Sequence, residues 1–407
     1  MCHIGEILVV EVKQMVIGKE ILARAANAMN VKSKETIQVA IDYCIINDAV
    51  SNLSIDYLCD EDSIFDKNKV AVIIDHDTPS GSEAVSIIQR KLINFAKKYD
   101  TIYHEGEGVG YQLMLDHYVK DGQIIAGCGE HISVLGAVGA IAFKVSPRRL
   151  AEVVKSGILE MKVPEFIKIE FSGNLSPGVY AKDLILHVIK DVGTTKLAGK
   201  ILEFTGEALQ ALTLNDRITI CNLAGKTNAA SAVVNLSESS NGDEYGATYQ
   251  YDLGLVKPSI ATPGSYDNIL EVDQVGNIKV NEVFIGGCSG GRIEDLRLAA
   301  KIIKGRKVSK GIRLMVAPIT SSVYVQALRE GLITEFIDAG AVIMNQGCSV
   351  CWGKSQGIID ADEVLVSAGS FNCMGCAGAK NAKIYISSAV TAAESSITGI
   401  ISQARIR

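Results

Sequence analysis

The sequence predicts an α/β protein of two or three domains, and its length, hydropathy and composition carry that prediction. The chain has 407 residues, whereas a single domain commonly spans about 100–200 residues. It is 48% hydrophobic and 21% charged, with a mean hydropathy of +0.22, so it is expected to bury a large core. Glycine is abundant at 38 residues, proline is scarce at 7, and aromatic residues make up 6%. This composition favours an α/β protein with glycine turns over a β-sandwich.

The first region, to about residue 163, alternates helix-forming and strand-forming segments. Residues 18–29 are good helix formers, and β-branched runs follow at 70–75, 123–127 and 140–145. Loops after strand ends are where α/β proteins usually place their chemistry. Asp75, His76, Cys128 and His131 occupy such loops and are therefore candidate functional residues.

Two further regions follow. The second is expected to hold a strand at 167–171, a helix at 181–192 and a linker in the Ser/Asn/Gly-rich segment 235–248. In the third, the pattern predicts helices at 293–303 and 322–331, and strands at 283–287, 312–318, 341–345, 364–367 and 383–387. The expected domains are therefore residues 1–163, 164–264 and 265–407.

Charge and hydropathy exclude several partners. The net charge is −6 and the isoelectric point about 5.7, and no stripe of Lys and Arg offers nucleic acid a binding surface. No apolar run reaches the ~18 residues that a membrane span requires, and the first ten residues lack the basic start of a signal peptide. We expect a cytoplasmic protein that binds neither nucleic acid nor membranes.

Ten cysteines are unusual for such a protein, because a reducing compartment favours metal ligation or reactive thiols over disulfides. Cys288 lies in a Gly-rich loop after a predicted strand, and Cys348 and Cys351 form a C-x-x-C pair in another. Three thiolates suit a metal site that keeps one coordination position open for substrate. Spacing alone leaves a second interpretation open, in which these cysteines are small buried hydrophobes.

These segments, and most of the remaining chain, resemble the aconitase family of [4Fe-4S] hydro-lyases. The resemblance is collinear and extends through residues 74–79, 106–112, 136–140, 163–165, 181–187, 203–206, 217–222, 294–300 and 388–396. It implies the first three domains of a four-domain architecture, without the swivelling fourth domain. It also implies that Cys288, Cys348 and Cys351 bind a [4Fe-4S] cluster.

The resemblance implies a reaction as well. Family members move a hydroxyl group between adjacent carbons by dehydration and rehydration of a small organic acid, with the open iron as Lewis acid. A histidine held by a neighbouring aspartate gives the departing hydroxyl its proton, and His76 and Asp75 match these positions, with His131 as a further catalytic candidate. The base is a serine on the swivelling domain, so a separate small subunit is expected.

Departures from the family pattern fall at positions expected to contact substrate. Tyr111 stands where the family has His, Glu130 lies in Gly-Glu-His-Ile where the family has Asp-Ser-His-Thr, and Lys226 replaces a Glu. The family segment Asn-Arg-Asn-Phe-x-Gly-Arg reads Ser-Phe-Asn-Cys-Met-Gly-Cys from Ser370 to Cys376. The expected substrate-binding residues are Tyr111, Glu130, Asn222, Lys226, Ser370, Phe371 and Cys376.

The last departure affects the substrate most. Phe371 and Cys376 replace two arginines, and neither can bond a carboxylate bidentately as a guanidinium does. We therefore expect a small hydroxy acid other than ordinary isopropylmalate or citrate. Glu130 and Lys226 are a hypothetical compensating pair beside His131.

Several alternatives stay open. Cys128, Cys373 and Cys376 either fill space or supply a thiol that caps the fourth iron or reacts. If one of these thiols takes part, the protein would act on a thiol or another sulfur-containing substrate. A separate alternative is a non-catalytic iron–sulfur sensor or scaffold that kept the three cluster cysteines after losing the substrate pocket. Retention of Asp75, His76, His131 and Asn222 favours an enzyme.

Overall fold

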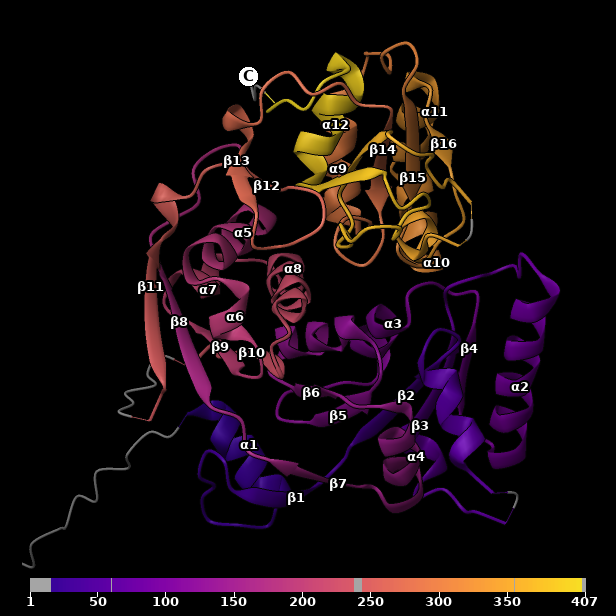
Figure 1. The fold of residues 1–407 in the computed structure, drawn as a ribbon, viewed down its shortest axis with the longest axis vertical. Coiled ribbons are helices and arrows are strands. Elements are labelled where there is room, and N and C mark those ends of the chain that lie inside the picture. Colours follow the sequence, from indigo (N-terminus) through magenta and orange to yellow (C-terminus); the bar gives the residue numbers. More distant parts are fainter. Residues whose placement is uncertain (1–15, 60, 238–243, 355, 405–407) are drawn as a thin grey trace, which may run out of the picture.

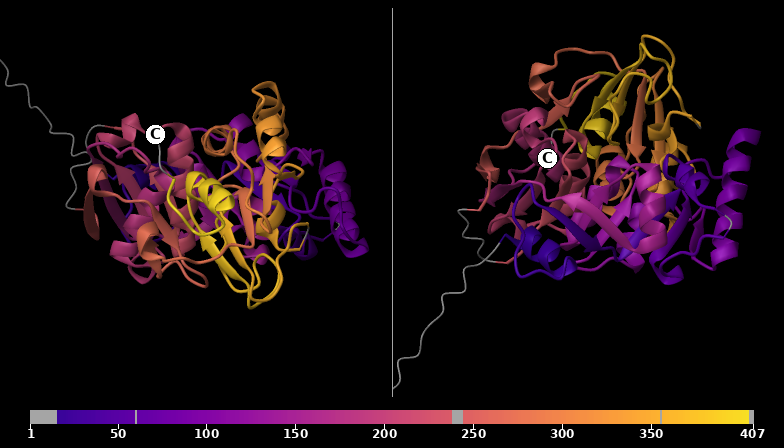
Figure 2. Two further views of the ribbon diagram at one scale, coloured as in Figure 1. Left: turned by 90° about the horizontal axis from the view of Figure 1, so that it is seen from above. Right: turned by 60° about the horizontal axis from the view of Figure 1, so that its bottom comes forward.

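The computed structural model describes residues 16–59, 61–237, 244–354 and 356–404, and it has three α/β regions in chain order (Figure 1). The first region lies at the bottom of Figure 1, the second at the left, and the third at the top. Seen from above, the third region lies across the middle of the molecule, between the second region and helix α2 (Figure 2). The predicted α/β class is confirmed.

The first region is built on a parallel five-stranded sheet of order β4-β3-β2-β5-β6. Its strands are β2 (Tyr43–Asn47), β3 (Val70–Ile74), β4 (Ile102–Glu105), β5 (Ile124–Gly127) and β6 (Ile141–Lys144). All five residues of β3 are buried, as expected for a continuous apolar strand in a covered parallel sheet. Its helices are α1 (Ile17–Ala25), α2 (Glu83–Tyr99), α3 (Gly110–His117) and α4 (Pro147–Ser156). A separate antiparallel pair joins β1 (Thr36–Ala40) to β7 (Ile158–Lys162).

The second region has a parallel four-stranded sheet of order β10-β9-β8-β11. Its strands are β8 (Phe166–Ser172), β9 (Ile201–Thr205), β10 (Ser231–Val234) and β11 (Ala247–Asp252). Its helices are α5 (Ala181–Val192), α6 (Thr194–Leu197), α7 (Ala208–Ala211) and α8 (Leu214–Ala224). Helix α8 begins at a capping box of Thr213 and Asp216, which satisfies backbone N–H groups of its first turn.

The third region has a mixed seven-stranded sheet of order β13-β12-β18-β17-β14-β15-β16. The strands are β12 (Ser259–Ala261), β13 (Ile269–Glu271), β14 (Glu282–Gly286), β15 (Arg313–Ala317), β16 (Val342–Ile343), β17 (Val364–Ser367) and β18 (Lys383–Ile386). Strand β12 pairs antiparallel with β13 and β18, and the other pairs are parallel. The helices are α9 (Ile293–Ile303), α10 (Ser321–Arg329), α11 (Leu332–Ala339) and α12 (Ala389–Thr398).

Most predicted elements occur close to their expected positions, and α5 and α9 have the expected bounds. The predicted helix 18–29 is shorter, because α1 ends at Ala25 and Asn27 adopts a positive φ of 51°. The end of the expected linker 235–248 is strand, since β11 begins at Ala247 and pairs with β8; residues 238–243 lie outside the described chain. The division at residues 264 and 265 stays a prediction, although β12 already belongs to the third sheet.

The first and third regions contact each other through their loops. A loop of the first region meets the third region where Gly108 bridges Thr320 and Val109 N–H donates to the Ile319 carbonyl. A Cβ on Gly108 would collide with that carbonyl, so the close approach requires glycine. No helix in the described ranges has the length and hydropathy to cross a membrane.

Candidate active site

A cavity of about 380 Å³ lies between the first and third regions. Eleven of the residues that the sequence singles out line it: Asp75, His76, Tyr111, Cys128, Glu130, His131, Cys288, Cys348, Cys351, Ser370 and Phe371. Most of them follow strand ends. The carboxyl ends of parallel strands meet at one edge of a sheet, and this brings these residues close together. The fold thus brings residues more than 200 positions apart to one wall.

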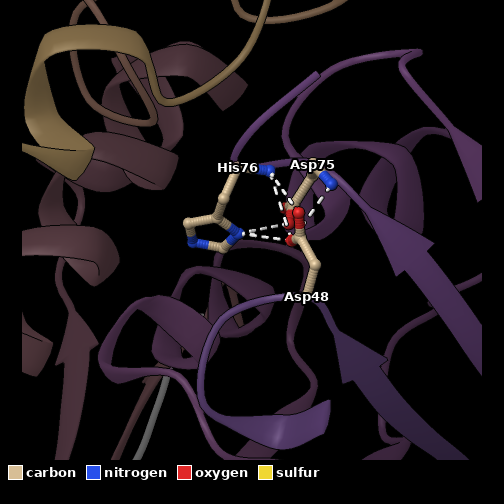
Figure 3. A group of neighbouring side chains, drawn as sticks. All are labelled: Asp48, Asp75 and His76. Carbon is tan, nitrogen blue, oxygen red and sulfur yellow. Dashed lines mark hydrogen bonds and ion pairs between the residues drawn. The ribbon is translucent and has the colours of Figure 1, made fainter. Parts of the chain in front are cut away.

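His76 is the centre of an ionic group at this wall (Figure 3). Its Nδ1 lies 2.6 Å from Asp75 Oδ1 and 2.9 Å from Asp48 Oδ1. Asp48 also accepts the backbone N–H of His76, and Asp75 Oδ2 accepts that of Gly110 at 2.7 Å. The second ring nitrogen points away from both carboxylates. The two carboxylates thus fix the ring and leave Nε2 available to a ligand.

These carboxylates determine the charge of His76. Burial alone would lower the pKa of the imidazole, but Asp75 and Asp48 outweigh it and raise that pKa to about 10. His76 is therefore a cation at neutral pH. The three groups also have the spacing of metal ligands, within 4.8 Å of one another, but the protonated Nδ1 of an imidazolium cannot bind a metal ion.

His131, by contrast, is held neutral. Burial and the nearby cations Lys226 and His76 place the pKa of His131 well below its usual value. Its Nε2 lies 3.4 Å from Ser370 Oγ, and its ring packs edge-on against Phe371 with centroids 4.9 Å apart. Two histidines with opposite pKa shifts at one cavity are typical of a site that divides acid and base roles.

Unsatisfied polar atoms lie beside His131. Within the described chain, His131 Nδ1 and both amide atoms of the fully buried Asn222 lack a protein hydrogen-bond partner. Buried polar groups in native proteins are almost always paired with protein, water or ligand. Asn222 itself acts on His131 as a hydrogen-bonding neighbour that favours its charged form, so these atoms can pair with each other or with ordered water.

The three cysteines fit an iron–sulfur cluster better than a single ion. Cys288, Cys348 and Cys351 all line the cavity, but their sulfurs do not all lie within 4.8 Å of one another. Thiolates on one zinc ion lie within about 4.6 Å, twice the Zn–S bond length, whereas those on a cluster bind different iron atoms. Burial raises the pKa of Cys348 and of Cys351, so both are thiols until a metal displaces the proton.

Glycines make room for these sulfurs. A Cβ on Gly369 would collide with Cys351 Sγ, and one on Gly287 would lie 3.4 Å from it. Cys288 Sγ lies 3.6 Å from Ser370 Oγ. The loops around residues 287, 351 and 369 therefore pack directly against one another.

Two buried cations, Lys182 and Arg292, form hydrogen bonds with the same loops. The Lys182 ammonium, from α5, donates to the Ala368 carbonyl, to the Gly369 carbonyl at 3.2 Å and to Ser289 Oγ at 3.2 Å. Arg292 donates to the Cys288 carbonyl and to Thr219 of α8, both at 2.5 Å. The second region thus fixes the position of the cysteine loops in the third.

The hypothetical pair of Glu130 and Lys226 forms an ion pair at 3.1 Å. Lys144 Nζ lies 3.4 Å from the same carboxylate. The Lys226 ammonium also lies 3.1 Å from the centre of the Phe371 ring, in cation–π contact. Burial alone would raise the pKa of Glu130, but Lys226 and Lys144 outweigh it and lower that pKa.

The other predicted residues occupy distinct places. Tyr111 packs its hydroxyl against Gly129, where a Cβ would collide with it. Cys128 lines the cavity, and burial raises its pKa to about 12. Three predicted substrate-binding residues do not line the cavity: Asn222, Lys226 and Cys376. Cys376 is joined to Cys373 in a disulfide, which differs from the expectation of free thiols.

Sequence reasoning missed Asp48, Lys144 and Trp352, which belong to the site. Trp352 packs against the His76 ring at a centroid distance of 4.5 Å and donates its indole N–H to Asp77 at 2.8 Å. Asp48 follows β2 and Lys144 ends β6, so their positions at strand ends could have indicated them.

Comparison with known proteins identifies the class of enzyme. The model of the Aconitase family (aconitate hydratase) matches residues 20–242 and 262–399. The 3-isopropylmalate dehydratase large subunit 2 of Archaeoglobus fulgidus is 33% identical over 91% of this chain and 94% of its own length. The corresponding large subunit of Clostridium kluyveri is 35% identical over 95% and 98%.

A more distant relative and a solved structure are also similar to this chain. The probable methanogen homoaconitase large subunit of Methanothermobacter thermautotrophicus is 29% identical over 94% of this chain and 96% of its own. The crystal structure of Thermococcus kodakaraensis aconitase X (holo-form) matches with a TM-score of 0.53 and 11% identity, covering 85% of this chain and 88% of that one, which supports the fold. The protein is thus a hydro-lyase. It belongs to the aconitase family.

Proposed function

We propose that this chain is the large subunit of a cytoplasmic [4Fe-4S]-dependent dehydratase or isomerase. It would act, with a separate small subunit, on a small hydroxy acid other than isopropylmalate or citrate. The observation that carries this proposal is that three thiols and a cationic histidine line one cavity. The relatives named as large subunits support the existence of a partner.

The cluster would be held by Cys288, Cys348 and Cys351, and when bound it supplies a Lewis acid for the substrate hydroxyl. His76 is the proton donor in this mechanism. Because Asp75 and Asp48 hold Nδ1, Nε2 faces the substrate and gives its proton to the departing hydroxyl, which leaves as water. The carboxylates keep the imidazole charged until that transfer.

The part of the cavity wall formed by Glu130, Lys144 and Phe371 decides the substrate. Lys144, Lys226 and Glu130 together carry one net positive charge, and Phe371 covers one face of the Lys226 ammonium. One carboxylate would balance that charge, whereas a second or third would have no guanidinium fork to receive it. Val50, Val109, Trp352 and Phe371 supply apolar surface on the same cavity. A hydroxy acid with one carboxylate at this wall and an apolar substituent therefore fits best.

The test is anaerobic reconstitution of the full chain with iron and sulfide, followed by electron paramagnetic resonance during titration with hydroxy acids and thiols. Hydroxy acids with one carboxylate should change the spectrum, and citrate should not. Cys348→Ser is the control and should fail to assemble the cluster. A response to thiols alone would replace this function with sulfur chemistry, and no response to either class would leave a non-catalytic iron–sulfur protein.

A further inference from the structure

Cys373 and Cys376 form a closed four-residue loop at the surface. Their Cα atoms lie 5.4 Å apart, within the range of protein disulfides, and the two sulfurs are joined. Cys373 and Met374 are exposed, whereas seven other cysteines of the described chain are free. A C-x-x-C pair with an exposed cysteine residue is a candidate for exchange with an external thiol.

The loop is anchored on both sides. Before it, the Asn372 side chain donates to the Thr262 carbonyl at 2.8 Å, and the Asn372 carbonyl accepts from Gly264 N–H at 2.8 Å. After it, the Ala377 carbonyl accepts from Ile359 N–H at 2.9 Å. Hydrogen bonds thus hold both ends of the loop in place, so a change inside it falls on the residues that the loop contacts.

The loop touches the segment that carries two of the proposed cluster ligands. The Cys376 carbonyl lies so close to Gly353 that a Cβ there would collide with it. Gly353 ends the short helix Ser349–Trp352, which contains Cys351. On its other side, the loop continues from Ser370 and Phe371 on the cavity wall. The pair thus adjoins both the cysteine segment and the substrate wall.

We propose that Cys373 and Cys376 are a reversible dithiol–disulfide pair, and that its state is transmitted through Gly353 to the segment of Cys348, Cys351 and Trp352. The reductant is a dithiol. Its two S–H groups give two electrons and two protons, the Cys373–Cys376 bond breaks into two thiols, and the reductant closes into its own disulfide. This site is separate from the proposed dehydration and does not depend on it.

Differential alkylation of the full chain tests the pair without any variant. Trypsin cleavage after Lys354 and Lys380 gives peptide 355–380, whose two cysteines are Cys373 and Cys376. In protein purified in air, iodoacetamide should not alkylate this peptide. After treatment with a dithiol the peptide should carry two alkyl groups. Treatment with an oxidised dithiol before alkylation should reverse the change. Peptide 35–67, which carries the exposed free Cys59, should react before reduction and serves as the internal control. Two groups on peptide 355–380 before reduction would overturn the proposal.

Transmission to the cysteine segment has its own reporter, since Trp352 is the one tryptophan of the chain. Reduction of the metal-free full chain should change the Trp352 emission in the wild type and in Cys59→Ser. The same treatment should leave the emission of Cys373→Ser unchanged. If the wild-type peptide gains two alkyl groups on reduction while Trp352 emission stays constant, the pair is reversible but the proposed transmission is wrong.

Discussion

The Asp48 carboxylate lies 2.9 Å from Nδ1 of His76, although the two residues are 28 positions apart. Asp48 follows β2 and His76 follows β3, which are neighbouring parallel strands. His76 therefore has two carboxylates on one nitrogen, of which the adjacent Asp75 alone is suggested by the sequence. This second carboxylate contributes to the cationic state of the proposed proton donor.

Asp48→Asn should lower the pKa of His76, because it removes one of the two charges that stabilise the imidazolium. In the wild type that pKa is raised to about 10. The Trp352 indole packs against the ring, so selective excitation of tryptophan during a pH titration should show a transition near pH 10 that moves to lower pH in the variant. His76→Asn is the control and should lack the transition.

Asp48→Asn should also change how the free energy of unfolding depends on pH. A histidine whose pKa is higher in the folded state stabilises the fold fully below its unfolded pKa, near 6.5, and this stabilisation is lost as the pH rises through about 10. The difference in free energy of unfolding between wild type and Asp48→Asn should be greatest near pH 6.5 and shrink toward pH 10. Denaturant titrations at several pH values measure it, and a difference that does not depend on pH would contradict this role of Asp48.

Glu130 and Lys226 should show energetic coupling. The Lys226 side chain is 5% exposed and lies 3.1 Å from the Glu130 carboxylate. Removal of Glu130 leaves this buried ammonium without its carboxylate, and removal of Lys226 leaves Glu130 with Lys144 alone. Residues in such contact commonly couple by about 0.5–3 kcal/mol. A double-mutant cycle of Glu130→Ala and Lys226→Ala, measured by denaturant unfolding, should fall in that range. Purely additive effects would show that the two residues do not act as a pair.

Much of this site could be predicted from the sequence, because strand ends of an α/β protein converge. Asp75, His131 and Cys288 each follow a recognisable apolar run, and all three reach the cavity. Asp48 also follows a strand end, but its contact with His76 could not be predicted, since that contact depends on which strand is the neighbour of β3. Lys182 was missed for a related reason: it lies on a helix whose pattern shows burial but not the loop that it contacts.

Lys182→Met should destabilise the cysteine loops. Lys182 is 3% exposed and donates to two carbonyls and to Ser289. The Ala368 carbonyl also accepts from Ser289 Oγ, so loss of Lys182 leaves the Gly369 carbonyl without this donor, which commonly costs about 1–3 kcal/mol. Thermal unfolding should show a lower midpoint, and reconstituted protein should lose iron faster to a chelator. Lys190→Met, on the exposed side of the same helix, is the matched control and should behave as wild type. Equal iron loss from the two variants would contradict the positioning role of Lys182.

Gly369→Ala should impair cluster assembly while the protein still folds. The added Cβ would collide with Cys351 Sγ, so the sulfur must move from the position it shares with the other cysteines at the cavity. Gly369 has no positive φ, and alanine therefore introduces a steric conflict without backbone strain. Iron content per chain after reconstitution should fall, with the far-ultraviolet circular dichroism unchanged. Gly81→Ala, where a Cβ meets nothing within 4 Å, should bind iron as the wild type does. Full iron loading of Gly369→Ala would mean that Cys351 does not need its observed position to bind the cluster.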